Sequence, residues 1–193
     1  MSTYYRQAQE LITSPEARKA FDISAEPASV RERYGHTSLG QCALLARRLV
    51  ESGCRFVGVD HSGWDHHFTI FPSLEKDMFP HLDRAYSALI EDLDKRGMLD
   101  STLVVLMGEM GRTPRVNNDA GRDHYPNVFS AAMAGGGIQG GRVVGESDSK
   151  GALPLRNPKP PQDVLATVYR HLGIDTNISY PDHSGRPIPV LPF

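Results

Sequence analysis

Apolar side chains recur every three or four positions in three stretches of the chain, and this spacing predicts amphipathic helices. Each stretch begins near a helix-starting residue and ends at a glycine that suits a C-cap. The predicted helices span residues 37–53, 73–97 and 160–173. Cys42 lies among the apolar positions of the first of them, so we expect it to be a buried free thiol.

Short apolar runs between these helices predict strands at residues 55–59, 102–107 and 127–133. The 102–107 run is β-branched and shows no alternation with polar residues, which is typical of a strand buried on both faces. Helices alternating with such strands predict an α/β fold with a mostly parallel sheet flanked by helices. We expect a single domain over residues 1–193, with a helical lead-in at 1–54 and the sheet and site loops at 55–193.

Composition narrows the class of protein. The 193 residues are 39% hydrophobic and 23% charged, which is typical of a globular domain and excludes wholesale disorder. The net charge of −2, without a stripe of Lys and Arg, gives no indication of nucleic-acid binding. No apolar run approaches the ~20 residues that span a bilayer, and the N-terminus lacks the apolar stretch of a secretory signal.

A first group of chemically capable residues follows the predicted strand 55–59. It holds three histidines and two aspartates within eight residues, too many for an apolar core: Asp60, His61, Asp65, His66 and His67. Imidazole with carboxylate suits Zn, Mn or Fe, whereas carboxylate with water suits Mg or Ca. A solvated polar loop is the alternative interpretation.

Two further groups adjoin the other predicted strands. Glu109 and Arg112 follow the 102–107 run, where a carboxylate and a planar guanidinium could serve an anionic ligand, or could simply form a surface ion pair. His124 precedes the third strand and could be a metal ligand oriented by a neighbouring carboxylate, or an ordinary loop histidine. We expect the sheet to bring Asp65, His67, Glu109 and His124 into one pocket.

In this order, the three groups resemble the family known as domain of unknown function 1501, which is bacterial. The resemblance covers essentially the whole chain. It is carried by the motifs Gly63-Trp64-Asp65-x-His67, Gly108-Glu109-x-Gly111-Arg112-Thr113-Pro114, Gly121-Arg122-Asp123-His124-x-Pro126-Asn127, Gly135-Gly136-Gly137 and Gly185-Arg186-Pro187-Ile188-Pro189. That family is grouped with the alkaline phosphatase and sulfatase superfamily, whose fold is a mostly parallel sheet between helices with one or two metals above the strand ends.

The resemblance implies a metal site. In the superfamily one metal is held by an Asp and a His from one loop and by a later His, and Asp65, His67 and His124 occur in that order. Glu109 resembles the acidic ligand of a second metal, but Met110 stands where a histidine often follows. Zn or Mn is the expected ion, with Ca or Mg as alternatives, and Arg112 and Glu109 are the candidate catalytic residues.

The implied activity is metal-dependent hydrolysis of a phosphate or sulfate ester, on a small molecule or a polysaccharide. Superfamily hydrolases carry their nucleophile near the start of the fold, whereas this chain opens in the helices that would follow it. We therefore expect an incomplete, C-terminal part of an alkaline phosphatase-like domain. A full-length relative would be periplasmic or exported. The alternatives are a non-catalytic metal- or polysaccharide-binding module, or an inactive truncated fragment.

Overall fold

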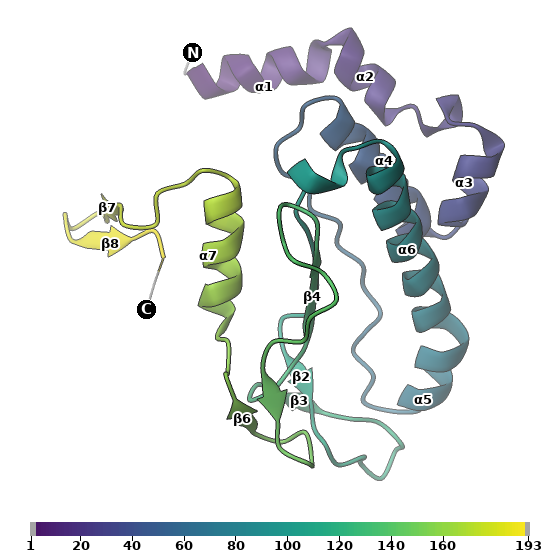
Figure 1. Cartoon of the computed structure of the whole chain (residues 1–193), viewed down its shortest axis with the longest axis vertical. Helices are drawn as coiled ribbons and strands as arrows, with labels where there is room; N and C mark the ends of the chain where they lie inside the picture. The colour runs from purple at the N-terminus through teal and green to yellow at the C-terminus, as the bar shows by residue number, and fades with distance from the viewer. Residues whose placement is uncertain (1–2, 192–193) are drawn as a thin grey trace. The chain divides into compact units, whose positions relative to one another are not determined.

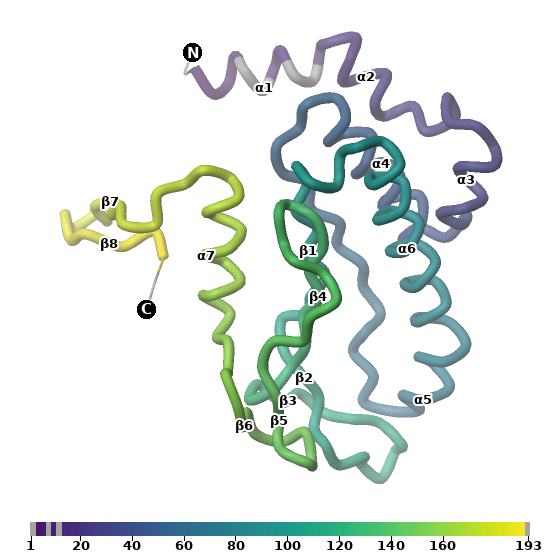
Figure 2. The backbone as a smooth tube through the Cα atoms, in the orientation of Figure 1, coloured from purple at the N-terminus to yellow at the C-terminus, as the bar shows by residue number. Residues whose placement is uncertain are grey.

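A computed structural model of the chain describes residues 3–191, except the side chains of residues 7, 8, 11 and 12. The chain forms two compact units (Figures 1 and 2). The first, here the helical unit, comprises Met1–Gly97 and Asp119–Gly121. The second, here the strand unit, comprises Met98–Asn118 and Arg122–Phe193.

The helical unit has its core between three helices. Its α-helices are α1 (Thr3–Thr13), α2 (Pro15–Phe21), α3 (Ala28–Tyr34), α4 (Ser38–Glu51), α5 (Ile70–Ser73) and α6 (Phe79–Lys95), with η1 (Ile23–Ala25) and η2 (Leu74–Met78) as short helical turns. Helices α4 and α6 pack side by side, and α3 contacts both (Figure 1). The buried apolar cluster there consists of Tyr34, Leu39, Ala43, Leu44, Ala85 and Ala88.

Hydroxyl side chains cap the starts of two helices in this unit. Ser14 Oγ accepts a hydrogen bond from the backbone N–H of Ala17 at 2.9 Å, with Pro15 in the first turn of α2. Thr37 caps α4 in the same way through Gly40, at 3.2 Å. Gly40 also lets α4 approach the end of α3, because a Cβ at this position would overlap the backbone carbonyl of Tyr34.

The prediction that Cys42 is buried is wrong, because the thiol is exposed. The buried face of α4 contains Gly40, Ala43, Leu44 and Arg47. At about 100° per residue, Cys42 lies about 200° around the helix from Gly40, on the opposite side. The apolar spacing along α4 therefore did not identify its buried face, because that face includes the charged residue Arg47 and excludes Cys42.

Arg47 is the centre of a buried ion network in the helical unit. Its side chain is fully buried, and its guanidinium nitrogens lie 3.0 Å from Glu26, 2.6 Å from Glu51 and 2.9 Å from Asp92. Arg47 Nη1 donates a hydrogen bond to Glu51. The N–H groups at Nε and Nη2 do not point at the oxygens of Asp92 and Glu26, so these two contacts are ion pairs without a hydrogen bond. Arg48 pairs with Glu26 as well. The network therefore ties the 22–26 turn, α4 and α6 together.

This network makes the helical unit sensitive to acid. Burial raises the pKa of the Glu26 carboxyl, but the adjacent guanidinium groups of Arg47 and Arg48 outweigh burial and hold this pKa below its ordinary value. Burial also raises the pKa of the Asp92 carboxyl. The neighbouring Arg96 and Arg47 outweigh burial and lower this pKa below its ordinary value. A carboxyl whose pKa is lowered by folding stabilises the fold above its unfolded pKa, about 4, and ceases to do so as the pH falls through the folded value.

We therefore expect the urea midpoint of the helical unit, followed by helical circular dichroism, to be higher at neutral pH than below about pH 4. The loss should occur below about pH 5, where these carboxylates begin to take up protons. A midpoint unchanged down to about pH 3 would contradict this role of Glu26 and Asp92.

The strand unit consists of short hairpin-like pairs, one α-helix and loops. Its strands are β1 (Val104–Met107), β2 (Gly111–Arg112), β3 (His124–Tyr125), β4 (Ala131–Ala134), β5 (Glu146–Ser147), β6 (Pro154–Arg156), β7 (Ser179–Pro181) and β8 (Pro187–Pro189), and its helices are η3 (Leu99–Ser101) and α7 (Pro161–His171). The strands form four antiparallel pairs, β1–β4, β2–β3, β5–β6 and β7–β8. Among the described residues of this unit, Leu191 is the only buried hydrophobic side chain.

The predicted mostly parallel sheet flanked by helices is wrong. The 102–107 run does form a strand, β1, but it pairs antiparallel with β4 and most of its residues are only half-buried. Residues 55–59 run extended without joining a sheet (Figure 2). An apolar run without alternation does not distinguish a strand buried on both faces from a half-buried one, so the pattern could not decide between the two arrangements.

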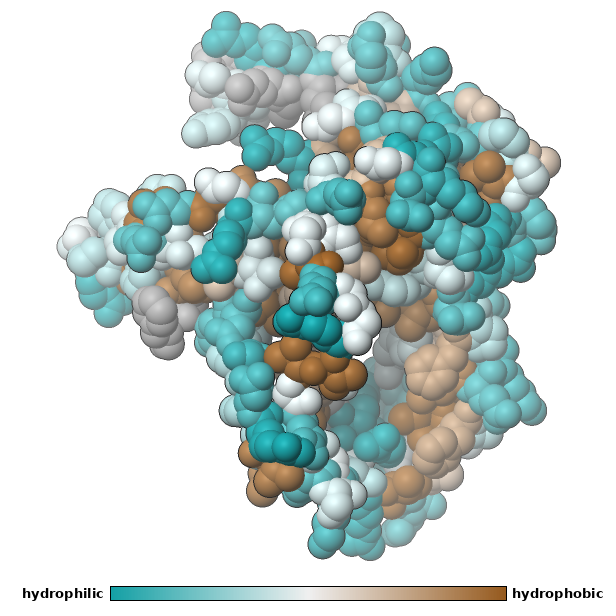
Figure 3. Space-filling view, viewed as in Figure 1, coloured by the Kyte–Doolittle hydropathy of each residue, from teal (hydrophilic) through white to brown (hydrophobic). Residues whose placement is uncertain are grey.

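Hydrophobic side chains accordingly remain on the surface, as the brown areas of Figure 3 show. The exposed ones include Phe56, Phe68, Val143, Leu155 and Tyr180. No helix within residues 3–191 is both long enough and apolar enough to cross a membrane.

Candidate metal centre

Asp65 and His67 lie on the extended segment that connects α4 to α5. His67 Nε2 is 3.0 Å from Asp65 Oδ1, and both side chains are substantially open to solvent. Trp64 fixes the segment beside them, since its indole N–H donates to His61 Nδ1 at 3.1 Å and its ring packs against Phe79 of α6 at 6.1 Å between centroids. The carboxylate and the imidazole are therefore held at neighbouring positions of an anchored loop.

A β-bridge brings a distant part of the chain against this segment. Phe68 pairs with Ala120, and the backbone N–H groups of Thr69 and Ile70 donate to the carbonyls of Asp119 and Ala120, both at 3.0 Å. Ile70 is buried directly after the bridge. The bridge therefore fixes residues 119–121 next to His67 inside the helical unit.

Gly121 is required at this contact. A Cβ there would overlap the backbone carbonyl of His67 and crowd the nitrogen of Phe68. Only a residue without a side chain can let the two backbones approach so closely.

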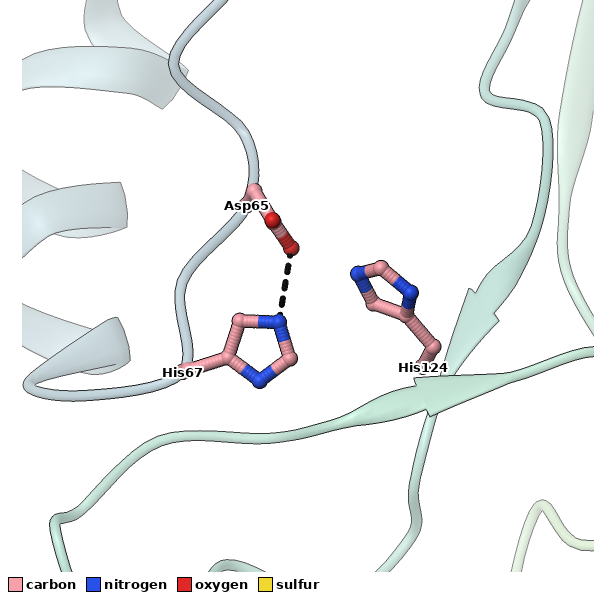
Figure 4. Close-up of side chains that lie close together, drawn as sticks. All are labelled: Asp65, His67 and His124. Carbon is pink, nitrogen blue, oxygen red and sulfur yellow. Dashed lines mark ion pairs between the residues drawn. The ribbon is translucent and has the colours of Figure 1, made fainter.

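His124 follows Gly121 by three residues, a distance that an extended chain covers in about 10 Å. It belongs to β3, and in the β2–β3 pair it lies directly opposite Arg112. One ligand atom from each of Asp65, His67 and His124 lies within 4.8 Å of the others. The three side chains point toward a shared space (Figure 4).

The arrangement offers two imidazole nitrogens and a carboxylate oxygen, a donor set that Zn and other first-row metals accept. A tetrahedral ion bound at about 2.0–2.2 Å needs ligand atoms about 3.4 Å apart, so atoms that lie within 4.8 Å of one another need to approach by at most about 1.4 Å. Side chains open to solvent can rotate that far without disturbing a core. Three protein ligands leave a coordination position open, which is typical of a catalytic rather than a structural site.

Two arginines hold the hairpin that carries His124. Arg112 Nη1 donates to the carbonyl of Arg122 at 3.3 Å, and Arg122 donates in return to the carbonyls of Thr113 and Arg112. This exchange stabilises a pair of strands only two residues long. One N–H of the Arg112 guanidinium, which was predicted to serve an anionic ligand, is therefore bonded to the backbone. Arg112 lies opposite His124 in the strand pair.

The other predicted site residues lie outside the three-residue group. Glu109 is exposed in the turn after β1. Asp60 is exposed, His61 accepts the hydrogen bond from Trp64, and the half-buried His66 keeps Nδ1 without a hydrogen-bond partner. The sequence pointed to the three residues that lie close together, but no pattern in it indicated the Phe68–Ala120 bridge or the reciprocal arginine contacts in the His124 hairpin.

Comparison with known proteins identifies a family and nothing more specific. No curated protein and no solved structure matches the chain. A family model described as "Protein of unknown function (DUF1501)" matches residues 1–191, which is nearly the whole chain. The suspected family is confirmed: the chain belongs to the DUF1501 family.

Proposed function

We propose that this chain binds one divalent transition metal, Zn or Mn, through Asp65, His67 and His124, and that the site serves hydrolysis of a phosphate or sulfate ester. The single observation that carries the proposal is the convergence of two imidazoles and a carboxylate from segments more than fifty residues apart in sequence. Exposed acidic residues often cluster without a metal. Two histidines and one carboxylate, contributed by two separate segments, form a donor set more specific to transition metals.

The residues around the ligands suit an anionic substrate. Arg112, opposite His124 in the hairpin, provides a planar guanidinium that matches two oxygens of a phosphate or sulfate group. A divalent ion held by the three ligands supplies Lewis acidity at the ester oxygen and a water of lowered pKa, about 7. Asp65 and His67 are open to solvent, so a substrate can reach the site without a lid opening.

Metal binding is tested by calorimetric titration of the untagged chain with zinc chloride after removal of metal by chelation. We expect one ion per chain. Replacing a ligand, His124→Ala, should weaken binding by more than the roughly 10–100-fold that loss of an outer-shell partner costs. His183→Ala removes an exposed histidine elsewhere and should leave the affinity unchanged.

The hydrolytic step is tested with aryl phosphate and aryl sulfate, with added Zn or Mn. Turnover that requires the metal and disappears in His124→Ala supports an esterase. Stoichiometric metal binding without turnover contradicts the hydrolytic part and favours a non-catalytic metal-binding module. Equal metal binding by the wild type and by His124→Ala would overturn the site itself.

A further inference from the structure

A pocket of about 320 Å³ lies in the strand unit, beside the loop that follows β2. Its lining side chains belong to Thr113, Arg115, Asn117, Asn118 and Asp123. All five are polar or charged. The pocket is open to solvent, and its volume falls at the lower end of the range found for small-ligand sites.

The walls of this pocket are fixed by hydrogen bonds. The backbone N–H of Thr113 donates to the carbonyl of Asp123 at 2.8 Å, and the Asp123 N–H donates to Thr113 Oγ1 at 3.1 Å. Thr113 Oγ1 in turn donates to the carbonyl of Arg115 at 2.8 Å, which turns the chain after Pro114. Asn117 donates to Asp123 Oδ1 at 3.3 Å. The pocket is therefore preorganised, which lowers the entropy cost of binding.

Arg115 is the exposed cation of this pocket. Within residues 3–191 its guanidinium has no hydrogen bond or ion pair, whereas Arg112 and Arg122 spend N–H groups on backbone carbonyls of the same hairpin. A guanidinium presents five donors and no acceptor, so it is suited to an oxyanion. Asn118 also lines the pocket, and its side-chain amide carries two further N–H donors.

Asp123 restricts which oxyanion fits. Its carboxylate can only accept hydrogen bonds, and Asn117 occupies one of its oxygens. A fully ionised oxyanion would be repelled by it, whereas an oxyanion that keeps a proton can donate that proton to the carboxylate. At mildly acidic pH phosphate keeps a proton, and sulfate does not.

We propose that this pocket binds a phosphate group, with Arg115 contacting its anionic oxygens and Asp123 accepting from its P–OH. The pocket is lined by none of the three candidate metal ligands, Asp65, His67 and His124. The assignment therefore goes beyond the proposed hydrolysis and does not require a metal.

The probes are inorganic phosphate and inorganic sulfate, titrated into the isotopically labelled full chain at about pH 6, with chelator present and ionic strength held constant. Amide signals of residues 113–118 and 123 should shift and saturate, at lower concentrations of phosphate than of sulfate. Because the chelator removes any metal, failure here is distinguishable from failure of the metal site.

Arg115→Gln should weaken phosphate binding by about tenfold or more, the usual effect of losing a charge-assisted hydrogen bond. The matched control is Arg170→Gln, which removes an exposed arginine from α7 in the same unit and should have no effect. Asp123→Asn keeps an oxygen for Asn117 but removes the charge, and it should abolish the preference for phosphate over sulfate.

Three results would overturn the assignment. Shifts that never saturate would show that no site exists. An equal loss in Arg115→Gln and Arg170→Gln would show that only general positive charge is involved. Equal affinity of the wild type for the two ions would contradict the role given to Asp123.

Discussion

Replacing Arg47 with alanine should destabilise the helical unit by about 3–5 kcal/mol, the typical cost of removing one partner of a buried ion network. The guanidinium is fully enclosed and lies within 3.0 Å of three carboxylates. Without it, the nearly buried Glu26 and the partly buried Asp92 lose a cation that compensates their charges. Denaturant unfolding followed by helical circular dichroism measures the change.

The matched control is Arg33→Ala in the same unit. Arg33 pairs with Glu91 at 2.6 Å, but about half of each side chain is exposed. An exposed pair contributes only about 0–1 kcal/mol. If Arg47→Ala cost no more than Arg33→Ala, the buried network would have no special role in stability.

Gly121→Ala should disrupt the metal centre without altering any ligand. The added Cβ would overlap the carbonyl of His67, so the Phe68–Ala120 bridge must open and the ligands must separate. We expect zinc affinity to fall by about 10–100-fold or more, as it does when the support of a ligand is lost. The buried cluster of α3, α4 and α6 lies elsewhere in the unit and should keep its helical signal.

Gly58→Ala provides the control, because it lies on the same extended segment and an added Cβ would meet no atom within 4 Å. Its zinc affinity should match that of the wild type. If Gly121→Ala also bound zinc normally, the bridge would not position the ligands and the site would assemble in another way.

Signals between neighbouring residues predicted the helices, whereas contacts between residues distant in sequence could not be predicted. The N-caps at Ser14 and Thr37 and the stop at Gly97 depend on neighbouring residues, so they could be anticipated. The burial of Arg47 could not, because it depends on carboxylates from two other elements and its charge suggests exposure. The pairing of β1 with β4 could not be predicted either, because the pattern of apolar residues within a strand does not identify the strand it pairs with.

The candidate ligands could be predicted for a similar reason. Histidine and aspartate in one short segment indicate metal chemistry by their types alone, and Asp65 and His67 occur in such a segment. Their approach to His124 depends on a tight backbone contact at Gly121, and a glycine in sequence does not reveal what it touches. Glu109 was predicted for the same pocket, and its exposed position after β1 leaves it outside the three-residue group.

The single bridge between Phe68 and Ala120 has a kinetic consequence. Two backbone hydrogen bonds next to it join the segment after His67 to residues 119 and 120, so the contact can open by a local fluctuation without unfolding the helices. An ion bound there would exchange quickly with its surroundings. Chelators would strip it within the time of a short dialysis, and the occupancy of the site in a cell would follow the prevailing supply of free metal.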